Sequence, residues 1–292
     1  MYTIKTPATS ANIGPGFDCL GIALTIYNSF DVSLSEKDEL DHVEDRFNNP
    51  ENLFLQAYHK GCESIGISDH IHASFHCEIP VSRGLGSSSS LIVGGLTAAS
   101  VLHDDALSDD QIFELAAEIE GHPDNAAPCV YGGLTASLNT GDRFITHQIP
   151  LASGWQFYVF IPDFEVSTNK ARAILPESYP RNVASGNAAH AILTTEALRN
   201  GNPAFLRVAA KDQLHEPYRK QLIEGYDDLK KITEEATDGT LLISGSGSTC
   251  ILITKSPLSK TAAEKIHNLP HNWQIHSVKE ASEGTEIWGD DR

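Results

Sequence analysis

A glycine- and serine-rich segment, PVSRGLGSSSS at residues 80–90, most constrains what this chain can fold into. It follows an alternating, strand-like run and precedes an apolar run whose hydrophobic residues would cover most of a helix surface. Glycines let backbone N–H groups turn inward, and a helix start adds free N–H groups and the positive end of its dipole. The segment therefore predicts an anion-binding loop at the start of a buried helix. A plain Gly/Ser turn fits the composition equally well, and the segment is neither a Walker A sequence nor GxGxxG.

The charge balance narrows the choice of partners. The 292 residues carry a formal net charge of −18, which disfavours nucleic acid and anionic membranes because both are bound through Lys and Arg. Five scattered cysteines form no CxxC pair and no metal-ligand spacing, which favours reduced thiols in the cytoplasm. The first residues show no signal-peptide pattern, and the most apolar stretch is too short to span a membrane. We expect a cytoplasmic protein without nucleic-acid or membrane partners, which must hold any anionic ligand through local donors.

Strand-like and helix-like segments alternate without regular βαβ repetition, which favours α+β layers in two domains. The pattern changes near residue 150, so we expect domains at residues 1–150 and 151–292. Ser108 and Gln111 predict a capping box, and Gly121 is expected to end that helix. Helices are predicted over residues 52–65, 91–102, 108–121, 187–198, 203–214, 227–236 and 259–268, and strands over 20–33, 71–79, 156–161, 241–244, 249–254 and 273–278, with a hairpin over 134–151.

Two further segments are rich in glycine and small polar residues, as residues 80–90 are. Residues 7–18, PATSANIGPGFD, form a rigid Pro/Gly turn that ends at Asp18, and residues 244–249, SGSGST, link two hydrophobic strands. Either loop also fits an ordinary turn, and for residues 244–249 a tight hairpin is the simpler interpretation.

The polar turn EGHPDN at residues 120–125 follows the helix predicted over residues 108–121. Glu120 lies at the negative end of this helix, where a carboxylate is electrostatically disfavoured, and nearer the apolar stripe than Glu114. A bound cation would explain this position. A solvated glutamate beside an Asp-Asn turn is the alternative.

Together and in this order, the motifs resemble the GHMP small-molecule kinase superfamily and, within it, the homoserine kinase family. The superfamily motifs are matched by residues 7–21, 80–90 and 244–249, and the homoserine kinase stretches by residues 120–133, 167–176 and 212–219. The resemblance implies an α+β, two-domain architecture, with an N-terminal domain like domain 2 of ribosomal protein S5 and a ferredoxin-like C-terminal domain. It also implies transfer of the γ-phosphate of Mg-ATP to the hydroxyl of L-homoserine in threonine biosynthesis, and it favours a homodimer.

The resemblance further implies roles for individual residues. Those expected to bind ATP are Pro80, Ser82, Arg83, Gly84, Leu85, Gly86, Ser87, Ser88, Ser89, Ser90 and, near the nucleoside, Asn52. Those expected to bind the amino acid are Asn12, Asp18, His122, Thr168, Arg172, Arg219 and Gly245. Those expected to be catalytic are Asp124, Asn125, Ser88 and Glu120, of which Ser88 and Glu120 would hold Mg²⁺. The chemistry agrees, because two arginines can clamp a carboxylate and Asp18 can pair with an ammonium group.

Several alternatives remain open at this point. Glu114 and Glu118 are alternative Mg²⁺ ligands, and whether Asp124 acts as a general base is undecided. Ser89 and Ser90 stand where relatives usually carry a small apolar residue, which is expected to change only the stiffness of the loop. A mevalonate or shikimate kinase would share the loops without the paired arginines. A non-catalytic nucleotide-binding regulator would keep the loops and lose the Mg²⁺ or substrate groups.

Overall fold

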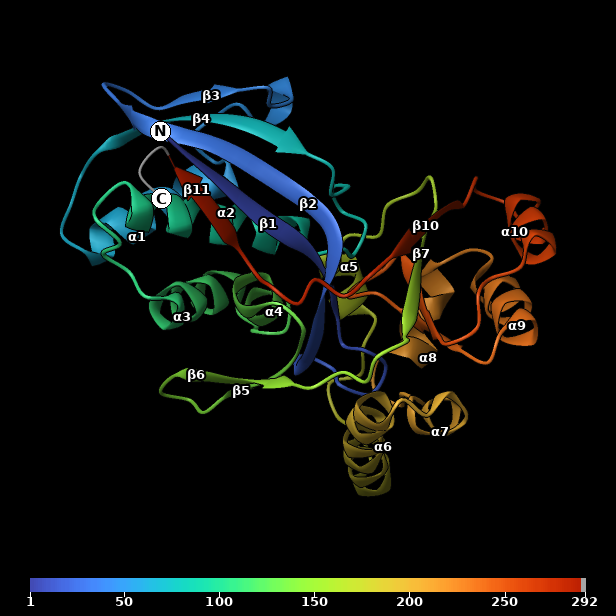
Figure 1. Cartoon of the computed structure of the whole chain (residues 1–292). Coiled ribbons are helices and arrows are strands. Elements are labelled where there is room, and N and C mark those ends of the chain that lie inside the picture. Colours follow the sequence, from blue (N-terminus) through green and yellow to red (C-terminus); the bar gives the residue numbers. More distant parts are fainter. Residues whose placement is uncertain (290–292) are drawn as a thin grey trace.

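Two β-sheets and their helices make up the chain, of which the computed structural model describes residues 1–289 (Figure 1). The first sheet contains β1 (Tyr2–Ala11), β2 (Leu20–Ser35), β3 (Glu39–Asp41), β4 (His70–Cys77), β5 (Leu134–Asn139), β6 (Phe144–Ile149) and β11 (Glu286–Gly289). The second contains β7 (Gln156–Ile161), β8 (Thr240–Ile243), β9 (Cys250–Thr254) and β10 (Gln274–Val278). Its antiparallel order β10-β7-β9-β8 is that of a ferredoxin-like sheet. The expected α+β, two-domain architecture is confirmed.

The helices divide between the two sheets (Figure 1). Those of the first half are η1 (Asp45–Phe47), α1 (Leu53–Ser64), α2 (Ser87–Val101), α3 (Asp109–Glu120) and α4 (Ala126–Tyr131). Those of the second half are α5 (Thr168–Ala173), α6 (Arg181–Asn200), α7 (Pro203–Ala209), α8 (Glu216–Arg219), η2 (Lys220–Leu222), α9 (Tyr226–Ala236) and α10 (Lys260–His267). The predicted capping box at Ser108 and Gln111 is confirmed, and Gly121 caps α3 in the left-handed conformation.

Helix α2 carries the phosphate-loop candidate at its start and is buried along nearly its whole length, as its apolar run predicts. Helix α1 and helix α2 cover one face of the first sheet, where Ile71, Ala73 and Phe75 of β4 are buried. The residues that alternate with them are exposed or half-buried, which gives the period of two expected for a strand with one face in water. This packing fixes the start of α2 relative to the sheet.

The structure differs from the sequence-based elements in several places. Residues 7–11, expected in a loop, complete strand β1, and helices α4 and α5 were not expected. The helix expected over residues 203–214 ends at Ala209, because Asp212 Oδ2 accepts hydrogen bonds from the N–H groups of Leu214, His215 and Glu216 and starts a separate turn. Strand β11 was not expected, and it pairs with β1. Residue 150 falls between β6 and β7, which belong to different sheets. We therefore propose a domain division at residue 150 in which residues 286–289 rejoin the first domain.

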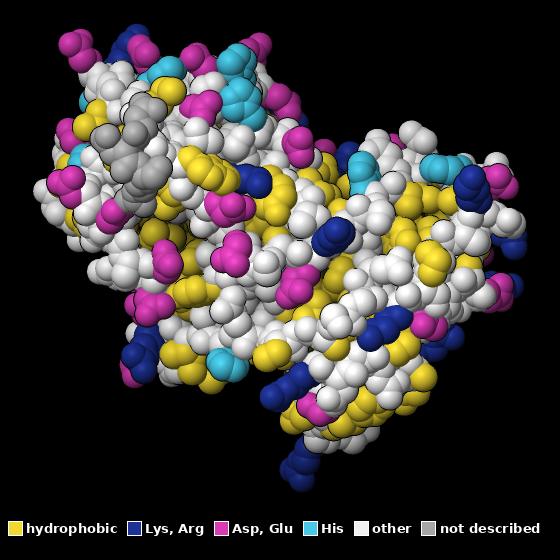
Figure 2. Space-filling model, viewed as in Figure 1, with side chains coloured by type: hydrophobic (Ala, Val, Ile, Leu, Met, Phe, Trp, Pro, Cys, Tyr) yellow, Lys and Arg dark blue, Asp and Glu magenta, His cyan; other side chains and the backbone are white. Residues whose placement is uncertain are grey.

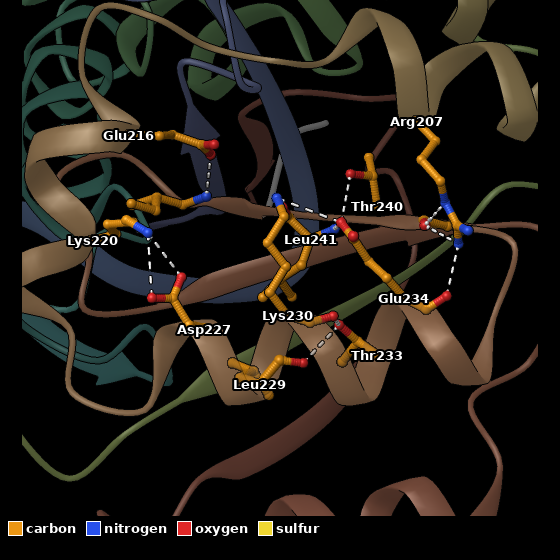
Figure 3. Close-up of polar contacts among 12 residues, drawn as sticks. Arg207, Glu216, Lys220, Asp227, Leu229, Lys230, Thr233, Glu234, Thr240 and Leu241 are labelled. Carbon is orange, nitrogen blue, oxygen red and sulfur yellow. Dashed lines mark hydrogen bonds and ion pairs between the residues drawn. The ribbon is translucent and has the colours of Figure 1, made fainter.

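Side chains cover the outer edge of β8, the last strand of the second sheet (Figure 3). The Leu241 N–H donates to Glu234 Oε1 (3.1 Å), and the Leu241 carbonyl oxygen accepts from Lys230 Nζ (2.8 Å). The Ile243 N–H donates to Glu216 Oε1 (2.8 Å). An uncovered edge strand can pair with another chain, so these bonds close this edge.

Glu216 gives a prediction for the pH dependence of stability. Glu216 is 8% exposed, and burial raises its pKa to about 7 from 4.5, although Lys230 lowers it in part. Between these values the folded protein retains a proton that the unfolded chain releases, so the free energy of unfolding falls as pH rises. Glu216→Gln keeps the Oε1 acceptor and removes the titration. We expect equal stability near pH 4.5 and a variant more stable by about 3 kcal/mol above pH 7. Urea unfolding across this range measures it, and a pH-independent difference would contradict the prediction.

Candidate active site

A cleft of about 810 Å³ lies where loops of the two halves meet. It collects most of the residues expected to form the site: Asn12, Asp18, Asn52, Ser82, Arg83, Gly84, Gly86, Ser87, Ser88, Ser89, Glu120, His122, Asp124, Asn125, Thr168, Arg172, Arg219 and Gly245. These residues come from seven separate stretches of sequence, so the fold brings motifs that were recognised independently to one cavity.

Three expected nucleotide-binding residues lie outside the lining of this cleft. Pro80 comes just before the first lining residue of this loop, and the side chain of Leu85 is fully buried. Ser90 is fully buried and its hydroxyl bonds with Thr6 Oγ1 (2.7 Å) and Asn28 Nδ2 (2.8 Å). Ser90 therefore joins α2 to β1 and β2, and its side chain is committed to the fold.

The loop at residues 80–90 leads directly into α2, as expected. Gly84 and Gly86 adopt positive φ angles of 74° and 67°, which favour glycine. The first helical hydrogen bond runs from the Ser90 N–H to the Gly86 carbonyl oxygen (2.9 Å), so the N–H groups of residues 87–89 precede it at the rim of the cleft. Free N–H groups at the positive end of a helix are suited to phosphate oxygens.

The three glycine-containing loops also pack directly against one another. A Cβ on Gly84 would lie 2.3 Å from the Ser244 carbonyl oxygen, and Ser244 Oγ donates to the Gly84 carbonyl oxygen (2.6 Å). A Cβ on Gly86 would lie 1.9 Å from Thr9 Oγ1, and the Thr9 N–H donates to the Leu85 carbonyl oxygen (3.1 Å). Glycine is therefore required here by contact between loops as well as by access to a ligand.

Gly86→Ala is expected to lower the free energy of unfolding by about 2–5 kcal/mol. The positive φ costs about 1–2 kcal/mol in a residue with a Cβ, and displacing the buried Thr9 adds about 1–3 kcal/mol. Gly121→Ala is a matched control, because Gly121 has a φ of 78° and nothing lies within 4 Å of an added Cβ. Its loss should stay at about 1–2 kcal/mol. Equal losses in urea unfolding would show that Thr9 imposes no steric constraint.

Glu120 is the last residue of α3 and lines the cleft, whereas Glu114 and Glu118 of the same helix do not. Ser89 Oγ donates to Glu120 Oε2 (2.5 Å). Burial raises the pKa of Glu120, and the nearby His122 and the Ser89 hydroxyl lower it in part. A cation beside the carboxylate would offset the cost of burying its charge. The geometry therefore favours Glu120 among the three candidate glutamates.

The donor atoms around Glu120 fit Mg²⁺ delivered with a phosphate ligand. Within residues 1–289, no group of three or more His, Cys, Asp or Glu side chains is placed to hold a metal ion alone. Mg²⁺ is commonly held by one or two carboxylates, with phosphate oxygens and water completing the shell. The Glu120 carboxylate and the hydroxyls of Ser88 and Ser89 provide oxygen atoms of this kind beside the anion-binding loop.

The polar turn after α3 is hydrogen-bonded to the segment at residues 7–18. Asp124 is 2% exposed, and its Oδ1 lies 2.7 Å from His122 Nδ1. Burial by itself lowers the pKa of His122, but the Asp124 carboxylate and the Glu120 charge outweigh it, so the pKa is raised. Asn125 Oδ1 accepts a hydrogen bond from Thr9 Oγ1 (2.8 Å). The turn thus presents fixed polar groups to the cleft.

Charged groups of both signs also meet in the cleft. Arg172 pairs with Asp18 through two hydrogen bonds of 2.9 and 3.1 Å. The Asp18 N–H donates to Asn12 Oδ1 (3.1 Å), and Asn12 Nδ2 donates to the Gly245 carbonyl oxygen (2.9 Å). Arg219 is 2% exposed and donates to the same Gly245 oxygen (2.9 Å). Two guanidinium groups and one carboxylate in this arrangement can receive the carboxylate and ammonium groups of an amino acid.

One wall of the cleft was not found from the sequence. It is formed chiefly by His42, Val43, Glu44, Arg46, Phe47, Asn49, Leu53, Phe75, Cys77 and Leu91. These residues form no recognisable motif. The sole signal was Asn52, whose side chain caps α1 through the Phe54 N–H (2.9 Å) and donates to the Phe47 carbonyl oxygen (3.0 Å). Asn52 therefore holds this wall in place.

Comparisons with known proteins show the family to which this chain belongs. The family model for the N-terminal domain of GHMP kinases matches residues 52–133, and that for the C-terminal domain matches residues 194–270. A homoserine kinase of Clostridium botulinum is 38% identical, with 98% of each chain covered. One from Synechocystis is 36% identical, again with 98% of each chain covered.

Solved structures give the same picture. The crystal structure of homoserine kinase from Cytophaga hutchinsonii matches with a TM-score of 0.85 and 25% identity, over 98% of this chain and 96% of the other. Mevalonate kinase from Methanococcus jannaschii matches with a TM-score of 0.72 at 17% identity, over 95% of this chain and 98% of the other, which shows a shared fold alone. In residues 1–289, no helix is long and apolar enough to cross a membrane.

Proposed function

This chain belongs to the GHMP kinases, among the homoserine kinases, and from that premise we propose that it phosphorylates the hydroxyl of L-homoserine with ATP. The observation that carries the proposal is the shared cleft. An anion-binding loop and the charged groups of Arg172, Arg219 and Asp18 line the same cavity. These groups match the phosphates of a nucleotide and the charged ends of an amino acid. The product would be O-phospho-L-homoserine, an intermediate of threonine biosynthesis.

On the nucleotide side, the chain supplies backbone donors, hydroxyls and one carboxylate. The N–H groups of residues 87–89 would hold the phosphates, with the purine side of ATP against the wall near Asn52. Ser88 and Glu120 would hold Mg²⁺, and the Ser89 hydroxyl, which donates to Glu120, would orient its carboxylate. When bound, Mg²⁺ would neutralise charge on the phosphate oxygens during transfer.

On the acceptor side, the chain orients the hydroxyl for in-line attack without a phospho-enzyme. The arginines would bind the carboxylate, Asp18 the ammonium group, and Asn12 and Thr168 would complete the pocket. His122, Asp124 and Asn125 line the same cleft and would face the acceptor hydroxyl. Positioning and charge stabilisation supply most of the catalysis in phosphoryl transfer, so the proposal requires no general base. If one operates, Asp124 is the candidate, since it is the carboxylate of this turn.

The residues of the cleft do not favour the alternative functions, which are another GHMP kinase or a non-catalytic regulator. Mevalonate and shikimate each carry a carboxylate that arginines could bind, but neither has an ammonium group to pair with Asp18. A non-catalytic regulator has no use for the Glu120 carboxylate beside the phosphate loop. The observed pairing of Arg172 with Asp18 and of Ser89 with Glu120 therefore favours an active homoserine kinase.

The proposal is tested by a coupled ADP-release assay with L-homoserine, mevalonate, shikimate and galactose as acceptors. We expect ADP release with L-homoserine and only background release with the other three compounds. Preference for another acceptor would place the chain elsewhere among the GHMP kinases. ATP binding without ADP release from any acceptor would favour the regulator.

We also propose a cytoplasmic homodimer without nucleic-acid or membrane partners. The support for this setting is the net charge of −18 and five cysteines that are all free thiols. Figure 2 shows acidic side chains scattered over the outer surface of the first half of the chain. The dimer rests on the superfamily resemblance, and sedimentation analysis of the purified protein tests it.

A further inference from the structure

His215 is a fully buried histidine in the stretch DQLHEPYR, and the proposed mechanism gives it no role. It lies between two parts of the acceptor site. On one side its Nε2 is 2.8 Å from the Gly14 carbonyl oxygen, in the loop that carries Asn12 and Asp18. On the other side its Nδ1 is 3.5 Å from Arg219 Nη1. A single ring therefore contacts both the loop and the arginine.

The partners of His215 define the form of its imidazole. The Gly14 carbonyl oxygen can only accept a hydrogen bond, so Nε2 must carry the proton. The Arg219 Nη1 can only donate, so Nδ1 must offer its lone pair. A neutral ring protonated at Nε2 satisfies both contacts, whereas a charged ring would direct an N–H toward a cation. Burial lowers the pKa of His215, and Arg219 lowers it further against the opposing effect of Asp212, so the neutral form is favoured.

Two other contacts fix the same loop against the same segment. Asn187 Nδ2 donates to the Pro15 carbonyl oxygen (2.8 Å), while Asn187 Oδ1 accepts from the Gln213 N–H (2.9 Å). The ring of Phe17 stacks on His215, with 5.4 Å between centroids. The Arg219 guanidinium lies 5.1 Å from the Phe17 centroid. The loop is thus held to residues 213–219 at three places, directly at Gly14 and Phe17 and through Asn187 at Pro15, and its two ends, Asn12 and Asp18, line the cleft.

We propose that His215 is a positioning residue for the acceptor site, which sets the loop at residues 12–18 and the Arg219 guanidinium relative to each other. It does not touch the cleft, so it acts through these two groups. The inference rests on the proposed function in one respect: the loop and Arg219 are taken to bind the acceptor. Loss of the Gly14 bond should then weaken acceptor binding and leave the nucleotide side unchanged.

The test compares two polar replacements of different reach in the full-length protein. In His215→Gln the side-chain amide can occupy the place of Nε2 and donate to Gly14. In His215→Asn the amide is one carbon shorter and reaches only the place of Nδ1. His103→Gln is the control, because His103 has a side chain only 9% exposed and its contacts, Cys62 and Asp69, lie outside the cleft. KM for ATP and for the acceptor is measured in each, with the acceptor that the wild-type enzyme phosphorylates.

We expect His215→Asn to raise the acceptor KM about tenfold or more, the range for loss of a buried hydrogen bond, with the ATP KM within about twofold of wild type. His215→Gln should keep the acceptor KM within about threefold, and His103→Gln should change neither constant. Equal defects in the Gln and Asn variants, or a parallel rise in both KM values, would overturn the positioning role. If the proposed function is wrong, the wild-type protein will fail to release ADP with L-homoserine in the acceptor assay, and this result is obtained before any variant is compared.

Discussion

Glu120→Gln is expected to lower kcat for the phosphorylation of L-homoserine by about 100- to 1,000-fold. The substitution keeps the size of the side chain and an oxygen that can accept the Ser89 hydroxyl bond, but it removes the negative charge. Loss of one preorganised charge-stabilising group in a sequestered site typically costs this much. Because the carboxylate would hold the metal, the Mg²⁺ concentration that gives half-maximal rate should also rise, by about tenfold or more. Steady-state kinetics over a Mg²⁺ series measures both effects.

Two neighbouring glutamates on α3 serve as controls for this prediction. Glu118 is exposed, Glu114 is half-buried, and neither lines the cleft. Glu118→Gln and Glu114→Gln should therefore keep kcat within about twofold of wild type. If either control lost activity while Glu120→Gln retained it, the Mg²⁺ ligand would have to be reassigned. Nucleotide affinity that is equally tight with Mg²⁺ and with EDTA would argue against any carboxylate-held cation at this loop.

The sequence predicted the parts of the site that carry strong local signals. The loop at residues 80–90 was recognisable because glycine and serine gather where a strand pattern gives way to a helix pattern. Glu120 was recognisable because its position at the negative end of α3 needed an explanation. Each signal lies within about ten residues of sequence, and the structure places both features beside the same cleft.

The parts that the sequence did not predict depend on contacts between distant segments. The sequence suggests that Gly84 lets the backbone approach a ligand. In the structure, the carbonyl oxygen of Ser244, which is 160 residues away, also occupies the place that a Cβ of residue 84 would need. The wall near Phe47 is built from side chains without a motif, and β11 joins the first sheet from the far end of the chain. The helix expected over residues 203–214 failed for a local reason, since Asp212 captures three backbone N–H groups. Its apolar spacing could not reveal that competition.

Arg219→Ala is expected to raise KM for L-homoserine by about 100-fold or more, with the ATP KM within about twofold of wild type. Arg219 is 2% exposed, so a carboxylate that binds to it is largely removed from water, and loss of such a buried ionic contact costs about 2–5 kcal/mol. Arg172→Ala should have a smaller effect, about tenfold, because Arg172 is more exposed and already paired with Asp18. Initial-rate measurements with each substrate varied separately give both constants.

The matched variants separate recognition of the carboxylate from support of the fold. Arg219 also donates to the Ala171 and Gly245 carbonyl oxygens, so Arg219→Ala removes two buried hydrogen bonds as well as the charge. Arg219→Lys keeps the charge and loses the planar fork, so its acceptor KM should fall between those of wild type and Arg219→Ala. Arg199→Ala, at an exposed position near the end of α6, should leave both KM values unchanged. A defect confined to the ATP KM in Arg219→Ala would refute the carboxylate clamp, because it would place this guanidinium on the nucleotide side of the cleft.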